Sequence, residues 1–429
     1  MIDIKLLADI QGNWSEIEYG EGIIIHSGNF GFWDVETILN CDFNYLKQLI
    51  SFSTIIPSNI VDEINEVILI NQIPSQEVIQ SMKNKILPYF EYLDNFKGFE
   101  KPVYTIFGPM DDPRIIRKIQ TGQLVIPNLF LIDHLHNYII TQPNEPDIKI
   151  YGISGKFKFI KLFNNGDINE ENDIMGYEGR YDNLISGEFG ELWINLLQIS
   201  EFYQSNYHNK STINFFVCYN SIMKTPILEY LAMITNANFT VSSSLHFKFP
   251  IIGNEMSFLN SIENFKLKFS KFRIKFGEFF KIIQKDLISY CNNDEDLINN
   301  LEIGLEIFDK IPIINSNKII SLSLKDKIST NESISKINEL YFENFYNLWH
   351  FNLCDFKINN EFNFLTLNLA DGKVNLKNCN SFGFDFNFKI DNDTDDDDDF
   401  EMKEFKNRSR RGRGRGRGRG RAVRGRGFR

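Results

Sequence analysis

The chain has 429 residues, of which 42% are hydrophobic and 24% are charged, and its formal net charge is -11. This length suits one large domain or two average ones with tails, and the hydrophobic content is enough for a substantial core. The first residues lack the basic and apolar regions of a signal peptide, and no apolar stretch approaches the ~20 residues of a membrane helix. Five cysteines without C-x-x-C spacing fit a reducing compartment. We therefore expect a cytoplasmic and/or nuclear protein that is not secreted and has no membrane partner.

The first half of the chain alternates apolar strands with helical segments. A strand is predicted over residues 2–10, with Asp9 at its C-terminal end, and a second strand over 22–26. Residues 41–100 have a mostly helical pattern with serine cap candidates. Three further strands are predicted in "KPVYTIF", which ends in a glycine turn before a helix, in "NLFLIDH" and in "DIKIYGISGKF". Strands that alternate with helices and end in polar turns indicate α/β layering.

The second half continues this alternation and then becomes helical. The pattern predicts a long loop over 163–190, a helix over 191–204, a strand over 212–221, a helix over 225–237 and a strand over 239–247. Residues 260–310 are predicted to be helical, with Phe265, Phe269, Phe272 and Phe276 on one face that packs on the core. Around this stripe lie Lys266, Lys268, Lys271, Arg273 and Lys275, either as a solvated face or as a polyanion-binding surface. The stretch "NEFNFLTLNLADGKVNLKN" predicts a hairpin with Asp-Gly at its turn.

Polar residues follow five of these strands: Asp9, Asn29, Asp111, Tyr219 and His246. Their order and spacing resemble the calcineurin-like metallophosphoesterases, whose motifs are D-x-H, G-D-x-x-D, G-N-H-[DE], an isolated His and G-H-x-H. The phrases "DIQGN", "HSGNFGF", "PNLFLID", "ANFTVSSSLHF" and "LWHFNLCDF…GKV" are similar to a fungal and amoebal branch of that superfamily with an attached C-terminal domain of unknown function. The resemblance covers about residues 1–390.

The resemblance implies a fold and a domain order. It implies a four-layer αββα metallophosphoesterase-like α+β sandwich over 1–255, with the helical insertion at about 41–100. A helical segment and a β-hairpin extension over 256–390 would pack on this domain, and a disordered tail over 391–429 would follow.

The resemblance also implies a damaged metal site. Such sites hold two divalent ions ~3.5–4 Å apart, so a carboxylate must bridge them. Asp9 and Asp111 match acidic positions, but Asn29 stands where the bridging aspartate belongs and brings no charge. The other replacements are Gln11, Pro109, Met110 and Tyr219, whereas His246 is retained.

The predicted site follows from this mapping. We expect either no cofactor or one weakly bound divalent metal (Mn, Fe or Zn) held by vestigial ligands Asp9, Asn29 and Asp111. His246 is the catalytic candidate if the protein is active. The predicted pocket-lining residues are Gln11, Asn13, His26, Asp112 and Tyr219.

Structural roles compete with these functional ones. Asp9 and Asn29 suit turn caps, and Asp111 and Asp112 precede Pro113 where a helix N-cap is expected. His26 is predicted to be a packed, hydrogen-bonded histidine. His134 and His136 are expected to be loop residues because no nearby Cys or His completes a site.

The last residues carry the most specific binding signal. Residues 391–406 sum to -7, and the Arg-Gly repeat over 407–429 sums to +11. Its arginines are Arg408, Arg410, Arg411, Arg413, Arg415, Arg417, Arg419, Arg421, Arg424, Arg426 and Arg429. Arginine pairs with phosphates and stacks on bases, so we predict that the tail binds RNA or ribonucleoprotein and is a substrate for an arginine methyltransferase. Nuclear import or solubility alone are the alternative roles.

These features predict a degenerate phosphoesterase homologue, weakly active or inactive, that binds RNA through its tail. One alternative is an active but divergent metal-dependent phosphoesterase. The other is a protein-interaction scaffold.

Overall fold

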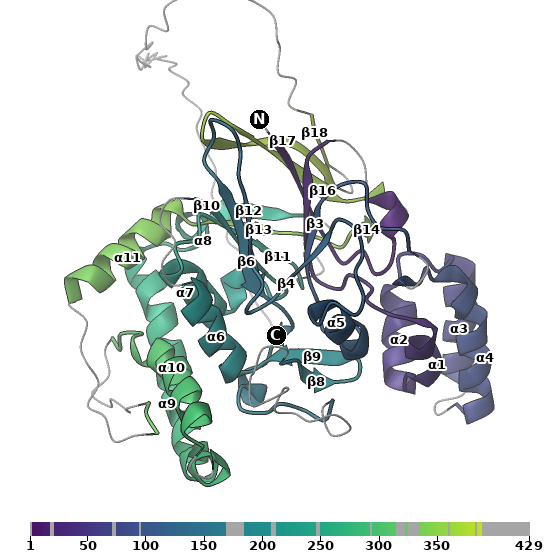
Figure 1. Ribbon diagram of the computed structural model, residues 1–429, viewed down its shortest axis with the longest axis horizontal. Helices are drawn as coiled ribbons and strands as arrows, with labels where there is room; N and C mark the ends of the chain where they lie inside the picture. The colour runs from purple at the N-terminus through teal and green to yellow at the C-terminus, as the bar shows by residue number, and fades with distance from the viewer. Residues whose placement is uncertain are drawn as a thin grey trace, which may run out of the picture. The chain divides into compact units, whose positions relative to one another are not determined.

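Two mixed β-sheets form the centre of the unit Met1–Phe388 (Figure 1). The structure is a computed structural model that describes residues 2–17, 21–70, 74–93, 96–168, 184–206, 212–245, 249–291, 294–314, 322–324, 334–358, 361–381 and 384–387. The chain divides into two units, Met1–Phe388 and Lys389–Arg429, and all the elements below belong to the first. The predicted acidic and Arg-Gly tail lies outside the described residues.

Sheet A has seven strands. In spatial order they are β18 (Phe384–Asn387), β17 (Lys373–Ser381), β16 (Phe364–Ala370), β1 (Ile2–Ala8), β2 (Ile23–Ser27), β3 (Val103–Ile106) and β4 (Leu129–Ile132). The strands β1 to β4 are parallel, and β16 pairs antiparallel with β1 so that Ile2 lies opposite Leu369. Segments from both ends of the described chain therefore build one sheet.

Sheet B has six strands. In spatial order they are β12 (Ile251–Asn254), β13 (Trp349–Asn352), β11 (Phe239–Ser242), β10 (Ile213–Cys218), β6 (Ile148–Ile153) and β5 (Tyr138–Ile140). The four central strands are parallel, and the two edge strands are antiparallel to their neighbours. Two small sheets join β14 (Lys357–Ile358) to β15 (Glu361–Phe362), and β7 (Lys156–Phe157) through β9 (Glu191–Ile194) to β8 (Ser186–Glu188).

The helices group around these sheets. They are α1 (Val35–Asn40), α2 (Phe43–Phe52), α3 (Ser58–Ile70), α4 (Gln76–Ile86), α5 (Pro113–Gln120), α6 (Leu196–Asn206), α7 (Pro226–Ile234), α8 (Glu255–Phe258), α9 (Ile262–Cys291), α10 (Glu295–Asp309) and α11 (Ile334–Asn347). Figure 1 shows α1 to α4 together in purple and blue, and α6 to α11 together in teal and green. The protein is thus of the mixed α+β class, and no helix among the described residues is long and apolar enough to cross a membrane.

The core follows the alternation of side chains along the strands. Ile4 and Leu6 of β1 pack with Phe215 and Val217 of sheet B, in a buried cluster shared by the two sheets. Leu7, the next residue, faces the other way and packs in the cluster that contains Ile115 of α5. The end of β1 is buried on both faces, and Leu6, Leu7 and Ala8 accordingly form an apolar run there.

The long helix α9 shows the predicted phenylalanine stripe. Phe265, Phe269 and Phe276 are fully buried, and Phe276 stacks on Phe308 of α10 with ring centroids 3.9 Å apart. The prediction that the charged residues between them form a solvated face is wrong at Arg273, which is buried and pairs with Asp309.

Two local predictions need correction. Residues 191–194 form strand β9 and not the start of a helix. Helix α6 begins after Asn195, whose side chain accepts a hydrogen bond from the Gln198 N–H while the Gln198 side chain accepts one from the Asn195 N–H. This reciprocal cap separates strand from helix. The predicted loop over 163–190 contains β8.

The C-terminal hairpin is confirmed. Strands β16 and β17 meet at Asp371 and Gly372, which both have positive φ, as the two-residue turn requires. The carboxylate of Glu145 accepts hydrogen bonds from both turn N–H groups. The turn is therefore tied to the connection between β5 and β6.

Candidate functional site

Two turns interlock at the C-terminal ends of β1 and β2. The N–H of Gln11 donates to the carbonyl of Asn29 (3.1 Å), and the N–H of Gly12 donates to that of Phe30 (2.9 Å). Gly31 has positive φ, and a Cβ there would lie 2.3 Å from the Gly12 nitrogen, so the turns approach too closely for a side chain. Asp9 and Gln11 also have positive φ, which costs energy for residues other than glycine.

Asn29 lies in the middle of this arrangement. Its side-chain N–H₂ donates to Oδ1 of Asp9 (3.0 Å), and its backbone N–H reaches the same oxygen (3.2 Å). Its side-chain oxygen accepts from the Met110 N–H (3.0 Å). The amide of Asn29 therefore links the turn after β1 to the turn after β3.

Tyr219 brings the end of sheet B to the same place. Its side chain is buried and hydrogen-bonded to the side chain of Asn29. Burial raises the pKa of Tyr219, and the nearby Asp9 carboxylate raises it further, so its hydroxyl stays protonated at neutral pH. Asp9, Asn29 and Tyr219 thus form one buried hydrogen-bonded group.

Both side-chain oxygens of Asp111 accept hydrogen bonds from backbone N–H groups. Oδ1 accepts from the N–H groups of Gly31 (2.8 Å) and Phe32 (2.9 Å), and Oδ2 accepts from those of Gly108 (2.7 Å) and Phe30 (3.2 Å). Burial raises the pKa of Asp111 to about 6, although these four bonds oppose the shift. This residue holds two loops together instead of presenting its oxygens to an ion.

The residues predicted to line a pocket are all buried. Nδ1 of His26 lies 2.8 Å from Thr105 Oγ1, and the Ile10 N–H donates to Nε2 (3.4 Å). Burial lowers the pKa of His26 to about 3. His26 is therefore a neutral, packed histidine, as predicted. Gln11 and Asn13 lie in the turn after β1.

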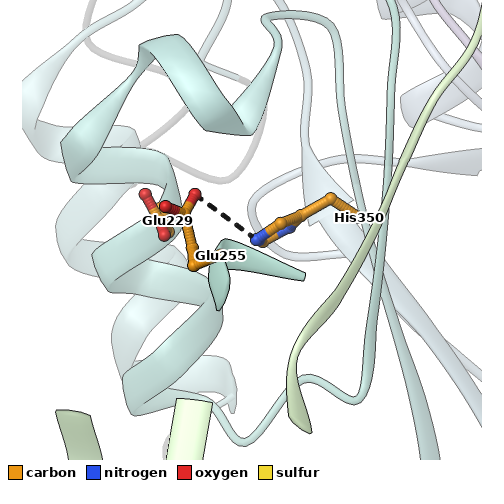
Figure 2. Close-up of side chains that lie close together, drawn as sticks. All are labelled: Glu229, Glu255 and His350. Atoms are coloured by element: carbon orange, nitrogen blue, oxygen red, sulfur yellow. Dashed lines mark ion pairs between the residues drawn. The ribbon is translucent and has the colours of Figure 1, made fainter. Parts of the chain in front are cut away.

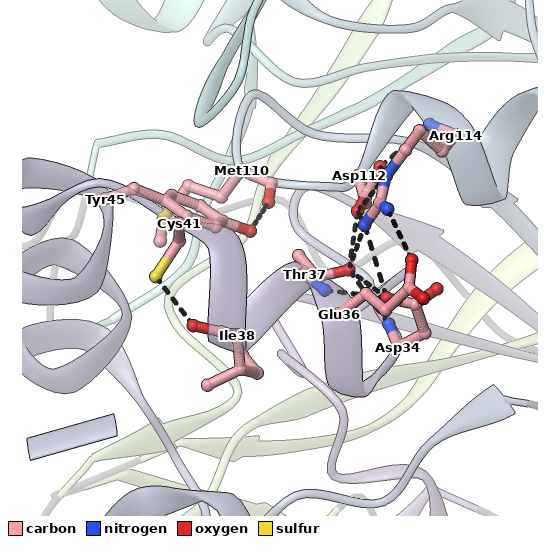
Figure 3. Close-up of polar contacts among 9 residues, drawn as sticks. All are labelled: Asp34, Glu36, Thr37, Ile38, Cys41, Tyr45, Met110, Asp112 and Arg114. Atoms are coloured by element: carbon pink, nitrogen blue, oxygen red, sulfur yellow. Dashed lines mark hydrogen bonds and ion pairs between the residues drawn. The ribbon is translucent and has the colours of Figure 1, made fainter. Parts of the chain in front are cut away.

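Asp112 caps helix α5, as predicted, and its carboxylate belongs to a separate polar network (Figure 3). Arg114 lies within ion-pair distance of Asp112 (2.7 Å), Asp34 (3.3 Å) and Glu36 (3.1 Å). The hydroxyl of Thr37 lies among the same groups, 2.5 Å from Asp112 Oδ2. The network links α1 to α5 beside the interlocked turns, and its carboxylates face Arg114.

Other predicted residues lie apart from this site or outside the described residues. His134 contacts Glu201 (3.2 Å), and His136 contacts Asp133 (2.8 Å). Both lie between β4 and β5 in a loop, as predicted. His246 and the arginines from Arg408 to Arg429 are outside the described residues.

This bonding does not suit a dinuclear metal centre. Such a centre needs several oxygens and imidazoles directed at two cations. Here Asn29 and Asp111 direct their oxygens at backbone N–H groups, and the Asn29 amide group points its hydrogens at Asp9. An N–H₂ group in that place repels a cation.

A second cluster lies away from the predicted site, between sheet B and the helices α7, α8 and α9. Glu229 of α7, Glu255 of α8 and His350 of β13 are all buried, and a ligand atom from each lies within 4.8 Å of the others (Figure 2). The ammonium group of Lys268, from α9, contacts Glu229 and lies 3.1 Å from Glu255.

The sequence patterns do not predict this second cluster. Its one signal is a charged residue on the apolar face of a helix: Glu229 within "PILEYLAMI" and Lys268 between the stripe positions Phe265 and Phe269.

Comparison with known proteins adds one match. The model of a family described as "Protein of unknown function (DUF2433)" matches residues 249–389. No curated protein matches the chain. The matched part contains β12, β13 and the β16–β17 hairpin, which complete both sheets, and it contributes Glu255, Lys268 and His350 to the second cluster.

Proposed function

We propose that this protein is a degenerate member of the calcineurin-like metallophosphoesterase superfamily that has lost hydrolytic metal chemistry and binds RNA or ribonucleoprotein through its Arg-Gly tail. The observation that carries the first half is the hydrogen bonding of Asn29, whose amide joins Asp9, Met110 and Tyr219 in the place where the family resemblance puts a bridging carboxylate.

The arrangement of layers supports the superfamily assignment. The two sheets share one buried cluster, and helices pack on the outer face of each. These contacts support the four-layer αββα order that the resemblance implies. The polar turns also follow neighbouring parallel strands, where α/β proteins place their sites.

The charge of the tail supports RNA as the partner. The Arg-Gly segment carries eleven arginines and no acid, whereas the rest of the chain is acidic. A polyanion bound by such a segment releases counterions, so binding weakens steeply as salt rises. With Phe428 as its only aromatic residue, the segment favours backbone contacts over base recognition.

The experiment has a metal arm and an RNA arm. Purified full-length protein is analysed for bound Mn, Fe and Zn and assayed for hydrolysis of a generic phosphodiester with added Mn²⁺. We expect no activity that depends on Asp9, because the neighbouring oxygens are committed to N–H donors. The Asn29→Asp variant is the matched control, since it restores the carboxylate beside Asp9 and should gain affinity for Mn²⁺. Hydrolysis by the wild type that is lost in Asp9→Ala would establish the divergent enzyme instead.

The RNA arm compares the full chain with a chain lacking residues 407–429. Ultraviolet crosslinking to RNA should disappear in the shortened chain, and should decrease in the full chain as salt is raised from 50 to about 200 mM. Equal crosslinking of the two chains would contradict the role of the tail and favour the scaffold function.

A further inference from the structure

Glu229, Glu255, Lys268 and His350 form a cluster of ionisable side chains with little or no exposure to solvent. The exposed fractions are 0% for Glu229, 2% for Glu255 and 1% for His350. Two carboxyl groups face one ammonium group, and burial raises the pKa of Glu229 to about 8, so Glu229 holds a proton at neutral pH. Lys268 balances the one remaining carboxylate, so a divalent cation would have to displace both the proton of Glu229 and the ammonium group of Lys268.

The imidazole of His350 is oriented toward the carboxylates. Its Nδ1 lies 2.8 Å from the hydroxyl of Thr240 on the neighbouring strand β11, which fixes the plane of the ring. Its Nε2 is buried, has no hydrogen-bond partner among the described residues, and points at Glu255 Oε1, 3.8 Å away (Figure 2). A histidine whose one nitrogen is held by a neighbour and whose other nitrogen faces carboxylates has the arrangement of a metal ligand.

We propose that Glu229, Glu255 and His350 form a binding site for one divalent cation of the zinc class, and that the Lys268 ammonium group occupies the cation position when the metal is absent. Two carboxylates and one imidazole are a ligand set that Zn²⁺ accepts, with water as a fourth ligand. The site is separate from the turns around Asp9 and is independent of the proposed function.

The side chain of Lys268 is partly exposed, although its ammonium group is buried in the cluster. Its side chain is 19% exposed, and its ammonium group lies over the rings of Phe265 (5.1 Å) and Phe269 (5.2 Å). Movement toward solvent would free the oxygens of Glu229 and Glu255 for a metal. A bound metal would then tie α7, α8 and β13 together, joining the segment matched by the family model to the preceding part of the chain.

The test measures Zn²⁺ binding by calorimetry in the full-length wild type, in Lys268→Met and in the double variant Lys268→Met/His350→Gln. We expect one equivalent to bind, at least about tenfold more tightly in Lys268→Met because a like charge has gone. The double variant should lose this tight equivalent. The double variant retains every cysteine and the acidic tail, so the Zn²⁺ that it still binds measures binding at other places on the chain. Glu263→Gln, an exposed glutamate on α9, is the control for a general loss of charge.

Two further measurements distinguish the loss of the metal site from the misfolding of a variant. Zn²⁺ should raise the melting temperature of Lys268→Met more than that of the wild type, and Co²⁺ bound to the wild type should show a visible spectrum without the sulfur charge-transfer band of cysteine ligation. Failure of both wild type and Lys268→Met to bind one equivalent would overturn the proposal, as would tight binding that survives in the double variant Lys268→Met/His350→Gln. Asp9→Ala should leave this binding unchanged, which keeps the result distinct from that of the proposed function.

Discussion

Asn29 differs from aspartate by one N–H₂ group, and its surroundings use that group. It donates to Asp9, while the amide oxygen accepts from Met110. An aspartate at this position would place two carboxylates about 3 Å apart in a buried site, where like charges repel strongly unless a cation lies between them. The asparagine thus makes this group of residues stable without a metal.

His26 provides a pH-dependent prediction. The pKa of His26 is lowered by burial to about 3, so the folded state does not take up a proton in the range where the unfolded chain, with a pKa of about 6.5, does. Stability from this group is complete above pH 6.5 and is lost as pH falls. Between pH 7.5 and pH 5 the wild type should lose about 2 kcal/mol more unfolding free energy than His26→Gln. Urea unfolding followed by tryptophan fluorescence at both pH values measures this, and an equal loss in the two proteins would contradict it.

Helix α9 shows what periodicity predicts at the scale of one element. The phenylalanine spacing predicts the buried face because it depends on neighbours in the sequence, and Phe265, Phe269 and Phe276 are indeed buried. The spacing does not reveal that Lys268 and Arg273 are enclosed, because their partners Glu229 and Asp309 come from other helices.

The two faces of α9 should differ sharply in their response to substitution. Phe276→Ala removes a ring that stacks on Phe308 in the core and should cost about 3–5 kcal/mol of unfolding free energy. Ile282→Ala on the same helix should cost no more than about 0.5 kcal/mol, because that side chain is 77% exposed. Chemical denaturation of both variants measures the difference, and similar costs would show that the helix packs differently.

The same distinction between local and distant partners explains the success and failure of strand prediction. Ile2–Ala8 alternates and then becomes apolar, and Ile23–Ser27 begins with three isoleucines, so both strands are predicted, with a two-residue excess at Asp9 and Ile10 for the first. Trp349–Asn352 was not predicted, because "WHFN" becomes a strand only by pairing with β11 and β12. The resemblance groups Asp9, Asn29 and Asp111, and they meet because parallel strands end at one edge, whereas the second cluster depends on packing that no motif records.

At the scale of the whole molecule, the segment matched by the family model is not a separate layer. Its strand β16 pairs with β1, and its strand β13 pairs with β11, so it completes sheets that begin in the preceding residues. The core clusters likewise combine residues from both parts of the chain.

A fragment containing only residues 249–389 should therefore fail to fold. Without β1 and β11 its strands would have open edges and unburied apolar faces. We expect a circular dichroism spectrum without a cooperative thermal transition, whereas residues 1–388 should give one sharp transition. A cooperative transition in the short fragment would show that the matched segment is an independent domain.

Because Ile2 pairs with Leu369, β1 is synthesised long before the strand that it pairs with. Ribosomes add about 5–20 residues per second, so β1 waits roughly 20–70 s before its antiparallel partner emerges. During that interval the nascent chain carries an apolar strand with one open side, which other nascent chains can pair with. The yield of native protein should therefore depend on whatever shields this strand during translation.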